Sequence, residues 1–192
     1  MRFNARFSRS EHYIGPGEFH SSVDDIVIAT LLGSCISVAL YDLSVPVGGL
    51  NHFMLPYQRA GQVNSEAPSS RFGVNAMEVL INDILKKGGA KRKLRAKVFG
   101  GSTMLVGSTA PIIDVPKMNI DFAFSFLDVE RIPVDSYSVG GTAPRRVYFF
   151  PTTAKVLMKF SQTTGSAIAR REFAYSHMLQ ERARNDGRPI LF

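Results

Sequence analysis

Apolar residues alternate with small or polar ones in the first third of the chain, which is the pattern of buried and half-buried β-strands. The run at residues 25–30 is rich in β-branched residues and predicts a strand that leads into a bend at Gly33. The run at residues 35–41 predicts a second strand directly afterwards. Three of its apolar side chains are expected to share one face: Ile36, Val38 and Leu40.

A hairpin is expected next, because turn residues separate this strand from another apolar run at residues 47–55. If the turn is centred between Leu43 and Ser44, Cys35 lies directly opposite His52. Opposed residues on an antiparallel pair have Cβ atoms roughly 4.5–5.5 Å apart, within which a thiol and an imidazole can form a hydrogen bond. A turn shifted by one residue would place the two side chains on opposite faces and weaken this pairing.

Helical periodicity follows in three later segments. Residues 70–88 place apolar residues on one face and polar ones on the other, and Gly88 is a suitable residue to end that helix. The aromatic residues of the segment 122–129 fit a helix face or a strand, and we favour the helix. Residues 166–187 predict an amphipathic helix, either a docked appendage or a partner-binding tail, with the docked form slightly favoured.

The segments outside these helices predict further strands and one long loop. Residues 94–101 have a strand pattern that closes on a glycine pair, and residues 138–151 and 154–160 predict a turn followed by a hairpin. Residues 57–70 are rich in Gly, Pro, Ser, Asn and Gln, which indicates an exposed loop able to act as a lid or to contact a substrate.

Length and composition restrict the class of protein. With 192 residues, 45% hydrophobic and 20% charged, the chain is long enough for one buried core, and we expect one domain with a tail. A single cysteine excludes an internal disulfide and fits a reducing compartment, and the basic N-terminus lacks the apolar stretch of a secretory signal. The longest apolar stretch, residues 26–41, is too short and too interrupted to cross a bilayer. We therefore expect a cytoplasmic protein without direct membrane insertion.

The net charge of +7 points to an anionic partner, and the densest basic run lies at residues 86–97. That run is equally explained as the solvated end of a helix. Nucleic-acid binding ranks below an enzyme, because the chain has none of the usual RNA- or DNA-binding patterns. The four histidines have no Cys or carboxylate at zinc-ligand spacing, so we expect no metal and no other cofactor.

Cys35 and His52 are the candidates for chemistry. A thiol becomes a nucleophile where a partner promotes the thiolate, and a histidine on the neighbouring strand is such a partner. The alternative is structural, since free cysteines are among the most buried residues and a histidine in an apolar strand is more often a hydrogen-bonded core residue.

Five motifs carry a resemblance to a known family: TLLGSC, GGLNHFMLP, RFGVNAMEVLI, KVFGG and VGGTAPRRV. In this order they resemble the chemoreceptor glutamine deamidase family CheD of bacterial chemotaxis, from about Gly15 to about Phe160. The most specific parts are the Gly-Ser-Cys element that ends at Cys35 and the Asn-His-Phe-Met-Leu-Pro element that contains His52.

The resemblance implies an α+β fold, a single domain with a β-sandwich-like core flanked by helices, similar to the catalytic domains of the cytotoxic necrotizing factor toxins. It implies a basic N-terminal extension at residues 1–14, a deamidase domain at 15–163, and an amphipathic helix with a tail at 164–192. The implied activity is that of a protein-glutamine glutaminase, which hydrolyses glutamine side chains of methyl-accepting chemotaxis proteins to glutamate and releases ammonia.

By motif, the resemblance makes Cys35 the nucleophile and His52 the base. The family usually has a threonine shortly before the Gly-Ser-Cys element, which orients the histidine. The nearest one here is Thr30, whereas Ala29 stands at the position six before the cysteine. Either Thr30 fills this role or the orienting residue is absent.

Further site residues are expected around this pair. The backbone N–H groups of the bend at Gly33 and Ser34 are candidates for an oxyanion site. Residues of the matching motifs are candidates for the substrate side: Asn51, Phe99, Gly100 and Gly101. Two positions depart from the family pattern: Asn119 ends a reduced Gly-x-x-Asn element, and Ala154 replaces a glycine.

The main alternative to an enzyme is a non-catalytic docking or regulatory module that binds chemoreceptors or a CheC-type phosphatase. Thiol reactivity is expected to separate the two, because a catalytic Cys35 should react rapidly near neutral pH and a buried structural one should not.

Overall fold

The computed structural model describes residues 1–55, 68–103 and 115–161, together with residues 168, 170–172, 174, 175, 177–179 and 181. Two five-stranded sheets form its framework, and each is mixed because one of its strand pairs is parallel. The α+β fold with two sheets and flanking helices is therefore confirmed, while the similarity to the toxin domains stays a prediction.

The first sheet has the strand order β1-β2-β4-β9-β10. Its strands are Arg2–Asn4 (β1), Arg9–Tyr13 (β2), Val27–Leu32 (β4), Arg145–Phe150 (β9) and Lys155–Phe160 (β10). The second sheet has the order β3-β6-β5-β7-β8. Its strands are Phe19–Ser22 (β3), Val47–Asn51 (β6), Ile36–Asp42 (β5), Arg95–Gly100 (β7) and Val134–Val139 (β8). The helices between the strands are Pro68–Lys86 (α1), Lys91–Lys93 (a 3₁₀ helix, η1) and Val115–Val129 (α2).

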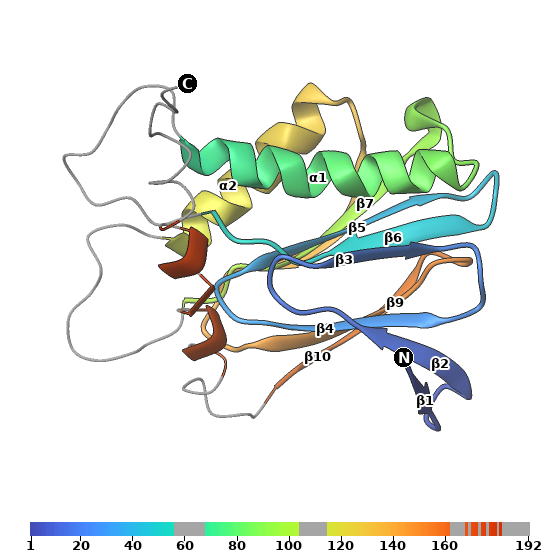
Figure 1. Ribbon diagram of the computed structural model, residues 1–192, viewed down its shortest axis with the longest axis horizontal. Helices are drawn as coiled ribbons and strands as arrows, with labels where there is room; N and C mark the ends of the chain where they lie inside the picture. The colour runs from blue at the N-terminus through green and yellow to red at the C-terminus, as the bar shows by residue number, and fades with distance from the viewer. Residues whose placement is uncertain are drawn as a thin grey trace, which may run out of the picture.

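The two sheets pack face to face, and this contact is the first layer of the core (Figure 1). Ile28 and Phe149 of the first sheet meet Ala39, Tyr41 and Leu50 of the second in one buried cluster. Because side chains alternate along a strand, the neighbouring residues of β5 must point away from this contact.

Helices α1 and α2 cover the outer face of the second sheet, as Figure 1 shows. The alternate residues of β5, including Ile36 and Val38, are fully buried there against Met77 and Leu80 of α1 and Leu127 of α2. The predicted face of β5 is thus confirmed, and the aromatic segment that fitted a helix or a strand is helix α2. Helix α1 ends before Gly88, as predicted, and that glycine has a φ of +99°.

The β5–β6 hairpin is confirmed, but its turn is centred one residue later than expected. Asp42 pairs with Val47, and the same register extends to the isolated bridge between Ile36 and Phe53. The side chain of Asp42 explains the shift, because its Oδ1 accepts hydrogen bonds from the backbone N–H of Ser44 at 2.8 Å and from its hydroxyl at 2.7 Å. This Asx-turn, in which the Asp42 side chain bonds to the backbone two residues later, fixes the position of the chain reversal.

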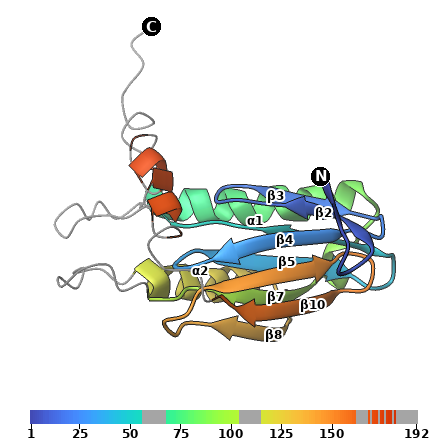
Figure 2. The same cartoon turned by 90° about the horizontal axis from the view of Figure 1, so that it is seen from below.

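The N-terminal segment and the described part of the C-terminal segment both pack on the two sheets. Residues 1–14, expected as an extension, contain β1 and β2, and β2 pairs with β4 in parallel. The described residues from 168 to 181 are helical and lie at one end of the two sheets (Figure 2). Their buried side chains Ile168 and Leu179 support the docked form of this helix.

Two further expectations concern the loop before α1 and the absence of a membrane-spanning segment. The loop expected at residues 57–70 lies outside the described residues, except that α1 already begins at Pro68. None of the helices in the described ranges is long and apolar enough to span a membrane.

Candidate active site

The site lies where the chain crosses from one sheet to the other. Strand β4 of the first sheet ends at Leu32, and β5 of the second sheet begins at Ile36, so residues 33–35 form the crossing. Strands β6 and β7 end and β9 begins near the same end of the molecule (Figure 1). The predicted nucleophile is therefore held at an edge where both sheets contribute residues.

The three carbonyl groups of the crossing are all fixed by hydrogen bonds. The backbone N–H of Ser102 donates to the oxygen of Gly33 at 2.7 Å, and that of Gly101 donates to the oxygen of Cys35 at 2.8 Å. Between them, Asn119 Nδ2 donates to the oxygen of Ser34 at 2.9 Å. Each carbonyl shares its peptide plane with the N–H of the next residue, so the bonds to the Gly33 and Ser34 oxygens hold the N–H groups of Ser34 and Cys35 in set directions.

The glycine pair after β7 allows this close packing. A Cβ atom on Gly100 would lie 2.1 Å from the backbone oxygen of Cys35, and one on Gly101 would lie 2.6 Å from Ile120. Both glycines have positive φ, +115° and +67°, a region that other residues rarely adopt. Gly100 and Gly101 therefore support the backbone of Cys35, and their expected place on the substrate side stays a prediction.

The N–H groups of the crossing converge on one carboxylate, that of Glu172 in the C-terminal helix. Its Oε1 accepts from the N–H of Gly33 at 2.8 Å and from that of Cys35 at 3.3 Å. Its Oε2 accepts from the N–H of Ser34 at 2.8 Å and from the Ser34 hydroxyl at 2.6 Å. The predicted oxyanion donors at Gly33 and Ser34 thus face an anionic group in this structure. A Cβ on Gly33 would lie 2.9 Å from Oε2, so a larger residue there would require the carboxylate to shift.

His52 lies beside Cys35, although the register differs from the expected one. Since Ile36 is bridged to Phe53, His52 lies diagonal to Cys35 and not directly opposite it. Moving the turn by one residue moves the partner by two positions, which keeps both side chains on the same face. The expectation that such a shift would separate them was wrong: a His52 ring nitrogen, Cys35 Sγ and a Glu172 oxygen all lie within 4.8 Å of one another.

The hydroxyl of Thr30 holds the ring of His52. Thr30 Oγ1 donates its one hydrogen to the backbone oxygen of Ile14 at 2.8 Å, and it lies 2.8 Å from His52 Nδ1. Its hydrogen is therefore used, so Nδ1 must be the donor in this contact, and Nε2 carries the free lone pair. Within the described part of the chain, the buried Nε2 has no hydrogen-bond partner.

The alternation of side chains along β4 explains why Thr30, and not Ala29, makes this contact. Ala29 packs with Tyr148 and Phe150 in a cluster that also includes Phe7 of the N-terminal segment. Its neighbour Thr30 points the opposite way, toward the second sheet and His52.

Burial controls the protonation of the pair. It lowers the pKa of His52 to about 4, against a smaller opposite effect of the Glu172 carboxylate. It raises the pKa of Cys35 well above the ordinary value of a thiol, and the nearby Glu172 adds to that rise. At neutral pH the site therefore holds a neutral thiol beside a neutral imidazole whose Nε2 can accept a proton.

Complete burial also changes what thiol reactivity can show. Cys35 has no exposed surface, and its thiol is kept protonated. Rapid modification of the unaltered protein is no longer expected, even if Cys35 is catalytic.

Of the other two residues predicted for the substrate side, Phe99 lies beside the thiol and Asn51 is directed away from it. Phe99 is buried in the same apolar cluster as Cys35. Asn51 is directed toward α1: its Oδ1 accepts from the N–H of Val38 at 2.8 Å, and its Nδ2 donates to the oxygen of Ala76 at 3.1 Å. Asn51 therefore stabilises the sheet–helix contact and does not face the thiol.

Two residues of the site were not predicted as such. Glu172 is separated from Ser34 by 138 positions, and nothing local marks it except that it is a charged residue within an apolar helical pattern. Asn119, noted only as a departure from the family pattern, is fully buried and joins Ser34 to Leu55, whose N–H donates to its Oδ1 at 2.8 Å.

Cys35, His52 and Glu172 also have the atom types of a metal site, which sequence spacing could not indicate because they are far apart in the chain. However, each oxygen of Glu172 already accepts two hydrogen bonds from the crossing. Such convergent N–H donors are typical of a site for an anion or a carbonyl oxygen.

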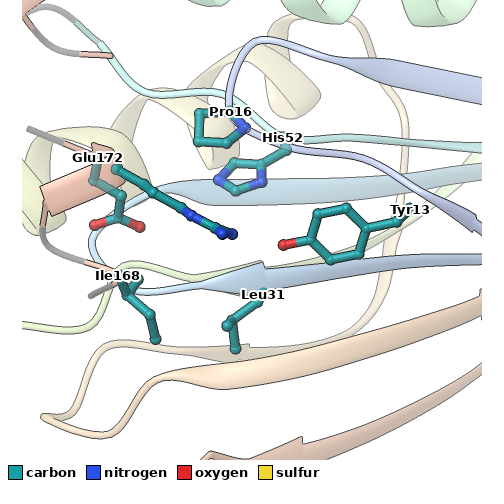
Figure 3. A pocket seen from close by; sticks show the side chains of 7 residues that line it. Tyr13, Pro16, Leu31, His52, Ile168 and Glu172 are labelled. Atoms are coloured by element: carbon teal, nitrogen blue, oxygen red, sulfur yellow. The ribbon is translucent and has the colours of Figure 1, made fainter. Parts of the chain in front are cut away.

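A pocket of about 150 Å³ remains open beside these groups. Figure 3 shows Pro16 and His52 above this pocket, Leu31 and Ile168 below it, and Glu172 and Tyr13 at its left and right. The pocket is thus bounded by the first and second sheets and by the C-terminal helix.

Comparison with known proteins adds independent information. The family model for CheD chemotactic sensory transduction matches residues 54–160, a range that begins after both Cys35 and His52. A probable chemoreceptor glutamine deamidase CheD of Herminiimonas arsenicoxydans is 41% identical over 179 residues, covering 93% of this chain and 87% of that protein. That of Janthinobacterium sp. (strain Marseille) is 40% identical over the same shares. A probable chemoreceptor glutamine deamidase CheD 1 of Burkholderia thailandensis is 39% identical over 174 residues, 91% of this chain and 74% of that protein.

Proposed function

Because this chain belongs to the CheD family of chemotactic sensory transduction, we propose that it hydrolyses glutamine side chains of chemoreceptors to glutamate, with Cys35 as the nucleophile. A carboxamide is a poor electrophile with a poor leaving group, so a covalent intermediate divides its hydrolysis into two easier steps. The substrates are methyl-accepting chemotaxis proteins, and a CheC-type phosphatase is a further partner on the same grounds of resemblance.

In the first step, Nε2 of His52 takes the proton of the Cys35 thiol while the sulfur attacks the amide carbon of the substrate. The carbonyl oxygen becomes an oxyanion and accepts hydrogen bonds from the N–H groups of the crossing, the positions now bonded to Glu172. His52 then gives the proton to the leaving nitrogen, the C–N bond breaks, and ammonia departs. A thioester between Cys35 and the former glutamine remains.

In the second step, His52 Nε2 removes a proton from water, and the hydroxide attacks the thioester carbon. The C–S bond breaks, the Cys35 sulfur regains a proton from His52, and a glutamate side chain is released. Thr30 acts as a positioning residue in both steps, because its hydroxyl keeps the proton on Nδ1 and leaves Nε2 available.

One observation supports this proposal most strongly. Three consecutive backbone N–H groups surround the carboxylate of a glutamate side chain, next to a thiol and to an imidazole in the tautomer of a base. A glutamate side chain is the product of the proposed reaction, and an amide of the same length fits the same space.

Mass spectrometry of a chemoreceptor cytoplasmic fragment tests the proposal. The fragment is incubated with the full chain and, separately, with Cys35→Ala, and its peptides are examined for glutamine-to-glutamate conversion. We expect conversion by the unaltered chain alone. Conversion by Cys35→Ala would rule out the nucleophile, and a fragment that binds but is not converted would favour the docking module.

A further inference from the structure

The carboxylate of Glu172 occupies the place that a substrate side chain needs. Glu172 is nearly fully buried, whereas its helix neighbours Arg170 and Arg171 are exposed. It comes from a helix outside the sheets, and four hydrogen bonds from the crossing at residues 33–35 hold it there. Hydrogen bonds to a charged group are among the stronger ones in proteins.

The rest of the helix docks with it. Ile168, one turn earlier, packs against Gly33, and Tyr175 packs against Gly17 in the loop that lines the other side of the site. Gly17 in turn donates its N–H to the backbone oxygen of His52 at 2.7 Å. The helix therefore closes the site through contacts with both walls, and not through Glu172 alone.

We propose that Glu172 is a built-in copy of the reaction product, and that the C-terminal helix must leave the site before a receptor glutamine can enter. The proposal rests on the deamidase function and adds its regulation. A tethered occupant competes at a high effective concentration. The apparent affinity for the receptor is therefore the intrinsic affinity multiplied by the fraction of molecules in the open state.

The donor pattern favours a carboxylate over an amide in this position. Each oxygen of Glu172 accepts two hydrogen bonds, but the –NH₂ group of an amide has no acceptor for the N–H of Ser34. An amide can still place its oxygen at the position of Oε1, which receives the N–H groups of Gly33 and Cys35. The closed state thus resembles the enzyme after its reaction.

The first test measures closure without any receptor. Alkylation of Cys35 by iodoacetamide is timed in the full chain, in Glu172→Ala and in Glu181→Ala, an exposed glutamate of the same helix. We expect Glu172→Ala to react faster by about tenfold or more, since even one lost charge-assisted hydrogen bond is worth that factor. Glu181→Ala should react at the rate of the unaltered chain. Equal rates for all three proteins, with unchanged melting temperatures, would overturn the proposal.

The second test uses the receptor fragment. We expect Glu172→Ala to deamidate it faster than the unaltered chain, with Glu181→Ala unchanged. A slower Glu172→Ala would show that Glu172 supports catalysis, and it would overturn the proposal. If no variant deamidates the receptor, the proposed function fails, and the alkylation rates alone decide whether Glu172 closes the site.

The third test turns the occupant into a substrate. In Glu172→Gln, the thiol of Cys35 can attack the new amide, release ammonia and form an internal thioester, which water hydrolyses back to glutamate. Peptide mapping should find glutamate at position 172 in this variant and glutamine when Cys35→Ala is also present. An amide that persists at position 172, in a chain that deamidates the receptor, would overturn the proposal.

Discussion

The hydroxyl of Thr30 has one hydrogen, and the use of that hydrogen determines what His52 can do. It is donated to the oxygen of Ile14, so the hydroxyl can only accept from Nδ1. The imidazole is thereby held in one tautomer and one orientation, and its low pKa keeps it neutral in ordinary buffers.

Replacing Thr30 with valine tests this effect. Valine has nearly the same shape but cannot accept from Nδ1, so both the tautomer and the ring position are lost. We expect kcat for receptor deamidation to fall on the order of 100-fold, the cost of a misplaced catalytic group, with little change in KM. Thr30→Ser keeps the hydroxyl and should restore most of the rate. A Thr30→Val enzyme with an unchanged kcat would contradict the positioning role.

Single residues could be predicted only in part. The proximity of Cys35 and His52 followed from their strands, because strand periodicity decides which side chains share a face. Glu172 could not be found in this way, since its contacts depend on how a distant helix docks.

At the scale of elements, the support behind Cys35 is as important as the groups in front of it. The backbone of Gly100 lies so close to Cys35 that a Cβ atom would collide with its carbonyl oxygen at 2.1 Å. The same oxygen is held by the N–H of Gly101. Strand β7 therefore acts as a rigid backing for the crossing between β4 and β5.

Gly100→Ala and Gly140→Ala make a matched pair, because both glycines have positive φ but nothing lies within 4 Å of a Cβ on Gly140. Gly140→Ala should cost roughly 1–2 kcal/mol of unfolding free energy, from backbone strain alone. Gly100→Ala should cost more, about 3 kcal/mol or above, since overpacking is added, and deamidation should be lost. Denaturant unfolding and the receptor assay measure both effects. Similar losses in the two variants would show that the close contact is unimportant.

The elements themselves were mostly predictable where hydrophobic periodicity is strong. Helix α1 and the β5–β6 hairpin are such cases. The turn position was not, because it depends on the side chain of Asp42, which also accepts from the distant N–H of Ala90 at 3.0 Å. Strand β2 was missed because its buried residue is a glutamate, Glu11, whose charge is paired with Arg2.

At the scale of the whole molecule, Arg145 joins the two sheets beside the site. It lies on β9 of the first sheet and is almost fully buried. Its guanidinium donates to the backbone oxygens of Gly100, Ser138 and Gly140, which belong to β7, β8 and the turn after β8. The site needs residues from both sheets, so this bridge helps to hold the crossing in place.

Arg145→Met tests the bridge, with Arg146→Met on the next residue of β9 as its control. Arg145→Met removes the side-chain donor of the Ser138 and Gly140 oxygens, while the Gly100 oxygen keeps the N–H of Gly140. Each unmet buried group costs about 1–3 kcal/mol, so we expect a loss of about 2 kcal/mol or more. Arg146 alternates to the other face of the strand and is only half-buried, so its replacement should cost much less. Equal unfolding free energies for the two variants would refute this role of Arg145.

The burial of Cys35 beneath the C-terminal helix also has a consequence for chemical durability. Peroxide oxidises exposed thiolates to sulfenic acid and then, irreversibly, to sulfinic acid. A thiol with no exposed surface and a raised pKa offers peroxide neither the thiolate nor a path to it. On the proposed opening of the site, we expect oxidation of Cys35 only in molecules whose helix has moved aside, so the closed form would protect the proposed nucleophile.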